Sequence, residues 1–115
     1  MKPGSAVIIH LINPTEKFWG VLDSLEPVGV VLRGINLSSF DDWMAQVARK
    51  ERRDQGLGLV TMFVPLFRVE RVFLDEQVGE VESYRQRFER RVGESIEHYL
   101  GLAEANDAGG AEIPS

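Results

Sequence analysis

The sequence predicts a mostly β fold with helices, an α+β class built on a small, strongly bent barrel of five strands. Apolar runs rich in β-branched residues recur before residue 38 and after residue 58, and a glycine, Gly20, interrupts one of them. Between and after these runs, apolar residues recur every three or four positions, which is the spacing of a helix and not the two-residue alternation of a strand. A glycine inside a strand usually marks a sharp bend, so we expect Gly20 to curl the sheet.

Length and composition place the chain among ordinary globular proteins. Its 115 residues allow one domain with a modest core, and 43% hydrophobic and 27% charged residues are typical of such domains. The chain has no cysteine, which excludes a disulfide framework and a thiolate metal site. No apolar run approaches the roughly 20 residues of a membrane span, and the N-terminus lacks the pattern of a secretory signal. We therefore expect a cytoplasmic protein without a membrane partner.

Five runs are predicted as strands: residues 6–12, 17–25, 30–37, 59–64 and 68–74. The first ends at the turn signal Asn13-Pro14, and the second and third are joined by a turn at Pro27-Val28-Gly29. Pro65 cannot donate to a strand ladder, so the chain should turn a sharp corner between the last two strands. Residues 1–76 together form the predicted barrel domain.

Two segments have a helical period. In residues 39–53, predicted as a helix inserted between the third and fourth strands, Phe40, Trp43 and Met44 begin one apolar stripe. That stripe is expected to pack on the barrel, whereas Trp19 could fill the core or face a neighbouring subunit. Residues 79–104 are predicted as one long amphipathic C-terminal helix. The last segment, residues 105–115, is predicted to be a disordered tail.

The predicted hairpin and corner resemble the Sm-like family, which comprises Sm, LSm and Hfq proteins. The segment Trp19-Gly20-Val21-Leu22-Asp23-Ser24-Leu25-Glu26 is similar to the first motif of that family, in which a glycine marks the bend and an acidic residue precedes the turn. Residues 63–73, with Pro65 at the corner, are similar to its second motif. The resemblance covers residues 6–37 and 59–75. It implies an Sm-like barrel that assembles into a homo-oligomeric ring of about five to seven subunits.

The resemblance also implies that the ring binds single-stranded RNA near the corner between the last two strands. The residues that would form this site are Arg33, Leu66, Phe67, Arg68 and Arg71. Their arginines would contact phosphates, and Leu66 and Phe67 would offer an apolar or stacking surface. However, Leu66-Phe67 stands where the family carries a Lys-His or Arg-Gly pair, and Gly29 replaces an asparagine of many Sm proteins. The alternative is a protein-interaction or assembly scaffold module that uses the helices at 39–53 or 79–104.

The charge pattern leaves both functions open. The net charge of −5 repels phosphate backbones over the whole surface. The arginines of residues 49–53 and 85–91 alternate with acids, a pattern typical of solvated helix faces. Arg33, Arg68 and Arg71 are the strand-borne cations, and they could instead pair with Glu26, Glu70 or Asp75.

No pattern of an active site is present. The chain lacks a phosphate-binding loop, a nucleophile elbow and the HExxH or CxxC spacing of metal sites. His10 and His98 have no partner at a catalytic spacing, and the pairs Asp41-Asp42 and Asp75-Glu76 are typical of helix starts and strand ends. We therefore predict a non-enzymatic protein without a cofactor or a metal.

Overall fold

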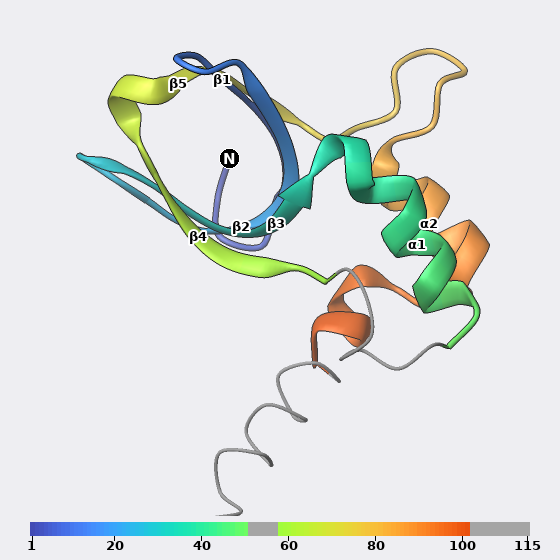
Figure 1. Ribbon diagram of the computed structural model, residues 1–115. Helices are drawn as coiled ribbons and strands as arrows, with labels where there is room; N and C mark the ends of the chain where they lie inside the picture. The colour runs from blue at the N-terminus through green and yellow to red at the C-terminus, as the bar shows by residue number, and fades with distance from the viewer. Residues whose placement is uncertain (51–57, 102–115) are drawn as a thin grey trace, which may run out of the picture.

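In the computed structural model, which describes residues 1–50 and 58–101, one antiparallel sheet has the strand order β4-β3-β2-β1-β5. Its strands are β1 (Ala6–Leu11), β2 (Glu16–Glu26), β3 (Gly29–Asn36), β4 (Val60–Pro65) and β5 (Val69–Leu74). The sheet curves strongly, and the helices α1 (Phe40–Ala48) and α2 (Tyr84–Val92) lie together outside the curve (Figure 1). The predicted α+β class with five strands is confirmed. The sheet stays open, because β4 and β5 are its two edges.

Two glycines face each other across β2 and β3 in the curved sheet. Gly20 pairs with Gly34 in the strand register. A Cβ atom on Gly20 would lie 2.7 Å from the carbonyl oxygen of Arg33, and one on Gly34 would lie 2.5 Å from that of Trp19. Neither position has room for a side chain, so the backbones approach closely where the hairpin folds over.

Apolar residues on the two faces of the sheet form two separate cores. The core inside the curve consists of Val7, Ile9, Leu11, Leu22, Val30, Leu32 and Val64. On the outer face, alternate positions of the same strands meet the helices in a core of Ala6, Trp19, Ile35, Phe40, Trp43, Met44, Leu59, Phe88, Ile96 and Tyr99. The two-residue period of a strand sends neighbouring residues to opposite faces, so one strand such as β1 serves both cores.

The inserted helix is held by its aromatic stripe, as its sequence period predicts. Phe40 and Trp43 are buried against Trp19, at ring-centroid distances of 5.2 and 5.9 Å. Before α1, the short 3-10 helix η1 (Leu37–Ser39) is capped by the side chain of Asn36, which accepts a hydrogen bond from the Ser38 N–H. The helix predicted over 39–53 is α1, which ends at Ala48; residues 51–53 lie outside the described part of the chain.

The C-terminal region differs from the single helix predicted over 79–104. A tight turn pairs Val78 with Val81, and α2 begins only after Ser83. Gly93 adopts a left-handed conformation with φ 89° and ends α2, and helical structure resumes over residues 96–101. Residues 102–104 and the tail predicted over 105–115 lie outside the described residues. None of the described helices is long and apolar enough to cross a bilayer.

The carboxylate of Asp75, directly after β5, joins the sheet to the helices. It accepts hydrogen bonds from the indole Nε1 of Trp19 at 2.9 Å and from the backbone N–H groups of Tyr84 and Arg85 at 2.8 Å each. Ser83 accepts a further bond from the N–H of Gln86 within a capping box. These acceptors satisfy the first free donors of α2, which a helix cannot pair internally. One acidic residue therefore fixes both the start of α2 and the buried ring of Trp19.

We expect Gly20→Ala to destabilise the protein by about 2–3 kcal/mol, because its Cβ would overlap backbone atoms of β3 that cannot move away. Gly58→Ala is the matched control, since a Cβ there meets nothing within 4 Å. The free energy of unfolding of both variants, measured with urea, checks this expectation. Equal stability of the two variants would show that the close approach at Gly20 is not required.

We also expect Asp75→Ala to lower the free energy of unfolding by about 2–4 kcal/mol, because the buried indole N–H of Trp19 and two helix donors lose their acceptor. Glu76→Ala, a change of the exposed neighbouring acid, should stay within about 0.5 kcal/mol of the wild type. Urea unfolding followed by tryptophan fluorescence measures both. A loss of similar size in the two variants would contradict a special role of Asp75.

Candidate functional site

The corner between β4 and β5, where the sequence predicts most of the RNA site, is the 3-10 helix η3 (Leu66–Arg68). Leu66 and Phe67 are 50% and 82% exposed. The N–H of Leu66 donates to the carbonyl oxygen of Val28 at 2.9 Å, so the corner lies beside the turn between β2 and β3. Val28 is also exposed. The corner and the turn thus form one apolar surface, which we call the apolar corner (Val28, Leu66 and Phe67).

Arg68 lies in this corner but serves the fold. Its guanidinium donates to the carbonyl oxygens of Ile12 at 3.1 Å and Pro14 at 2.8 Å, and it forms an ion pair of 2.8 Å with Glu16. The N–H of Ile12 in turn donates to the carbonyl oxygen of Arg68 at 2.9 Å. Arg68 therefore clamps the turn between β1 and β2 to the corner. Its Nε and Nη2 atoms are thus committed to protein partners.

The other two predicted arginines lie apart from the corner. Arg71 is on β5, 58% exposed, with its Nε 3.5 Å from Glu70 and its guanidinium 5.8 Å from the ring centroid of Phe73. Arg33 is on β3, opposite Thr61 at the start of β4, and it lines a small pocket of about 200 Å³ with Asp23. The structure thus brings Leu66, Phe67 and Arg68 together and places Arg33 and Arg71 elsewhere.

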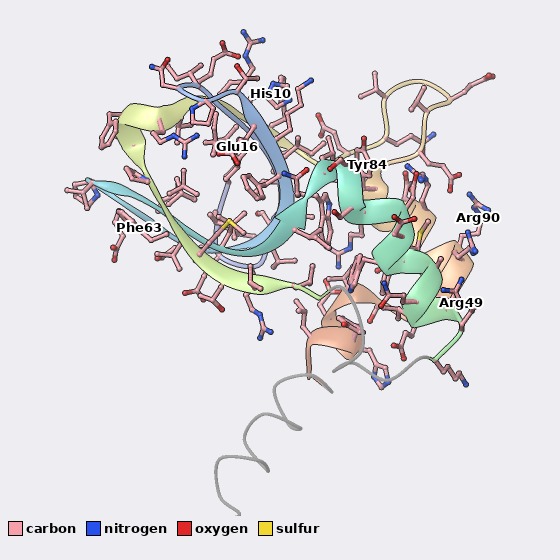
Figure 2. The ribbon with its side chains drawn as sticks, viewed as in Figure 1. His10, Glu16, Arg49, Phe63, Tyr84 and Arg90 are labelled. Carbon is pink, nitrogen blue, oxygen red and sulfur yellow. The ribbon has the colours of Figure 1, made fainter. Side chains whose placement is uncertain are left out.

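The two edge strands carry exposed apolar side chains that the sequence pattern did not single out. Val60 and Phe63 are more than half exposed on β4, and Phe73 and Leu74 are about two-fifths exposed on β5. Phe63 lies at the end of the sheet that is remote from the helices (Figure 2). The only available signal is that residues 60–65 hold no charged residue, although an edge strand usually carries one.

The predicted acidic pairs take part in the fold. Asp41 pairs with Arg87 of α2, and Asp75 holds Trp19 and the start of α2. Within the described residues, no three histidine, aspartate or glutamate side chains converge as a metal site would require.

The helices direct their apolar residues inward and their charged residues outward. On α2, Arg90 pairs with Glu82 at 2.9 Å, which lowers the pKa of that carboxyl through the hydrogen bond. Arg85 lies 3.4 Å from Glu89. An exposed pair such as Arg90–Glu82 contributes little to stability, so this part of the surface is a solvated helix face.

Comparisons with protein-family models, with curated proteins and with solved structures find no match to this chain. Its function must therefore be inferred from these surfaces.

We expect Arg68→Ala to destabilise the protein by about 1–2 kcal/mol, because two backbone carbonyls and Glu16 lose their donor. Arg71→Ala, which removes an exposed ion pair and the contact with the ring of Phe73, should change the free energy of unfolding by less than about 1 kcal/mol. Thermal and urea unfolding of the two variants give the comparison. If Arg71→Ala were the more damaging change, the clamp formed by Arg68 would be refuted.

Proposed function

We propose that this chain is a non-enzymatic, Sm-like assembly module whose copies join edge to edge into a homo-oligomeric ring. The Sm-like part of the proposal is supported by five antiparallel strands, a bend at Gly20 and a tight corner after Pro65, which are the features on which the resemblance rests. Among the described residues, many large apolar side chains are exposed and could contact another chain, which favours an assembly module over an enzyme.

The observation that carries the proposal is the pair of open, apolar edges. β4 and β5 are both six residues long, and each has one side without a strand partner in the described structure. Open edges with exposed apolar residues favour pairing with another chain unless charges or proline protect them. β4 exposes Val60 and Phe63, carries no charge and has its proline, Pro65, only at its end. β5 exposes Leu74 and is protected only by the neighbouring opposite charges of Glu70 and Arg71, so β4 is the less protected edge.

The geometry of the two edges favours a ring over a symmetric dimer. β4 and β5 are different surfaces at opposite ends of the sheet order, so β4 of one copy would pair with β5 of the next. A contact between unlike surfaces leaves one of each free, and such a chain of copies closes into a ring when the rotation allows it. The sheet of one copy curves strongly (Figure 1), and in the proposed assembly this curvature would turn each copy relative to its neighbour.

RNA binding is the second candidate function. It is favoured by Phe67, which is 82% exposed and free to stack on a base, and by the exposed Arg71. The net charge of −5 and the commitment of Arg68 to backbone carbonyls favour the assembly scaffold instead. Filter binding of oligo-U and oligo-A over a salt series separates the two, because binding through phosphates falls steeply as salt increases.

We expect the wild type to be oligomeric, and Val60→Lys or Leu74→Lys to reduce it to monomers, because a lysine on an edge opposes strand pairing. Each variant keeps one intact edge: β5 in Val60→Lys and β4 in Leu74→Lys. A mixture of the two should therefore form heterodimers. Light scattering after size exclusion measures the masses of the separate and mixed variants.

Val78→Lys is the matched control, since it places a lysine on an exposed apolar residue outside both edges. This variant should form oligomers of the same mass as the wild type. Circular dichroism verifies that each variant is folded. A monomeric wild type, or edge variants that keep the wild-type mass, would refute the proposed assembly. Monomeric variants that fail to combine when mixed would refute the pairing of unlike edges.

A further inference from the structure

Three nitrogen-bearing side chains form a row across the outer face of the sheet, beyond the part that the helices cover. His10 on β1 is paired in the strand register with Lys17 on β2 and with Arg71 on β5. Directly paired residues lie on the same face, and neighbouring strands are about 4.8 Å apart. The three side chains therefore start within about 10 Å of one another. We call this row the cationic row (Lys17, His10 and Arg71).

The charges around this row favour an anion. Burial lowers the pKa of His10, and the neighbouring charges of Lys17 and Arg71 lower it further, whereas Glu70 acts in the opposite direction. Glu70 is the acid that faces the row, and its 3.5 Å contact with Arg71 is an exposed pair of little strength. Lys17 is exposed and has no ion pair with any described residue. Glu16, next to Lys17 in the sequence, is already paired with Arg68.

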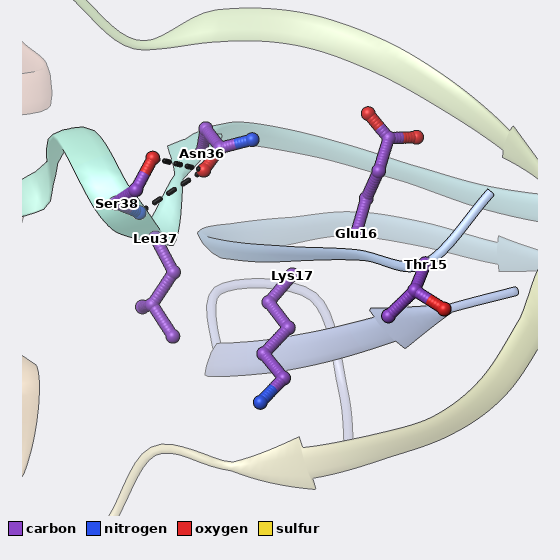
Figure 3. Close-up of a pocket in the computed structure, with 6 residues that line it drawn as sticks. All are labelled: Thr15, Glu16, Lys17, Asn36, Leu37 and Ser38. Carbon is purple, nitrogen blue, oxygen red and sulfur yellow. Dashed lines mark hydrogen bonds between the residues drawn. The ribbon is translucent and has the colours of Figure 1, made fainter.

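Apolar surface lies on both sides of the row. Phe73 packs its ring edge-on against His10 at a centroid distance of 4.9 Å and is 41% exposed. At the other end, Lys17, Thr15 and Leu37 border an open pocket of about 500 Å³, within the usual size of small-molecule sites. Lys17 and Leu37 point to one side of the sheet there, whereas Glu16 points to the other (Figure 3).

We propose that Lys17, His10 and Arg71 form a binding site for a phosphate group, with the pocket beside Lys17 and the ring of Phe73 accommodating the rest of the ligand. Lysine and arginine donate charge-assisted hydrogen bonds to phosphate oxygens, and protonated His10 adds a third cationic donor between them. A bound phosphate offsets the two positive charges beside His10, so it favours the protonated ring and strengthens its own binding. The site is independent of the proposed assembly, because strand pairing engages the backbone edge of β5 and leaves this face open.

The test uses the two histidines of the chain as internal probes. The pKa values of His10 and His98 are measured by proton NMR with inorganic phosphate, with adenosine monophosphate, with a short single-stranded oligonucleotide, and with sodium chloride at matched ionic strength. We expect phosphate to raise the pKa of His10 relative to chloride, and to leave that of His98 unchanged. His98 lies far along the chain and beside Glu94, at 3.4 Å.

Comparison of the three ligands identifies the kind of molecule that carries the phosphate group. Tighter binding of the mononucleotide than of inorganic phosphate assigns the site to a small phosphate ester whose ring lies near Phe73. Tighter binding of the oligonucleotide than of the mononucleotide assigns it to the phosphodiesters of a strand. Either result supports the site. A pKa of His10 that responds in no arm, or that moves together with that of His98, overturns it.

Substitutions complete the test. Lys17→Met and Arg71→Met keep most of the aliphatic side chain but remove the charge, so each should weaken phosphate binding about tenfold. Lys2→Met, an exposed lysine outside the row, should bind as the wild type does. The NMR spectra themselves verify the folding of each variant. Wild-type affinity in both Lys17→Met and Arg71→Met would overturn the site even if phosphate still moved the pKa of His10.

Discussion

The carboxylate of Asp75 is the connection on which the two halves of the molecule depend. Asp75 follows the last residue of β5, and its backbone N–H donates to the carbonyl oxygen of Ala6, so the sheet fixes the position of this residue. From there it holds the indole of Trp19 and the first N–H groups of α2. A buried indole N–H without an acceptor is costly, so this bond fixes the ring against which the helices pack.

The aromatic cluster outside the sheet extends from that ring. Trp19 contacts Phe40 and Trp43 of the inserted helix, and Trp43 stacks on Phe88 of α2 at 4.9 Å. Aromatic pairs in these geometries add modest stability beyond the area they bury. The cluster covers only part of the outer face, and the partly exposed His10 and the exposed Arg71 lie beyond it. The position of the helices thus determines which part of the sheet can meet a ligand.

Local sequence signals predicted much of the fold, but not the contacts between distant segments. The strand runs and the stripe of Phe40 and Trp43 depend on neighbouring residues, and the structure contains both. At Gly20 the structure shows a close approach of two backbones, which a glycine inside a strand often indicates. The role of Gly34 depends on the register of β2 with β3. That of Arg68 depends on a turn 54 residues earlier in the chain, so neither could be read from a local pattern. The sequence pattern predicts too long a C-terminal helix, because Val92 and Ile96 keep the apolar spacing of one helix across the interruption at Gly93.

The candidate sites likewise combine residues that a local pattern can identify with contacts between distant segments that it cannot. The sequence predicts Phe67 and Arg71 as RNA contacts, and the structure leaves both side chains exposed. Their separation and the bonds of Arg68 to backbone carbonyls arise from tertiary contacts. The cationic row is likewise hidden in the sequence, because its members are seven and more positions apart and meet only through strand pairing.

The facing glycines Gly20 and Gly34 have a consequence for stoichiometry. They let β2 and β3 approach closely at the middle of the curved sheet, and the curvature of that sheet sets the angle between the two open edges of one copy. In a closed assembly of unlike contacts, that angle is repeated at every junction and must add up to a full turn. In the proposed ring, the number of subunits would therefore depend on the curvature inside each protomer and not only on the residues of the two edges. A modest change in that curvature would then alter the diameter of the proposed ring without any substitution at its edges.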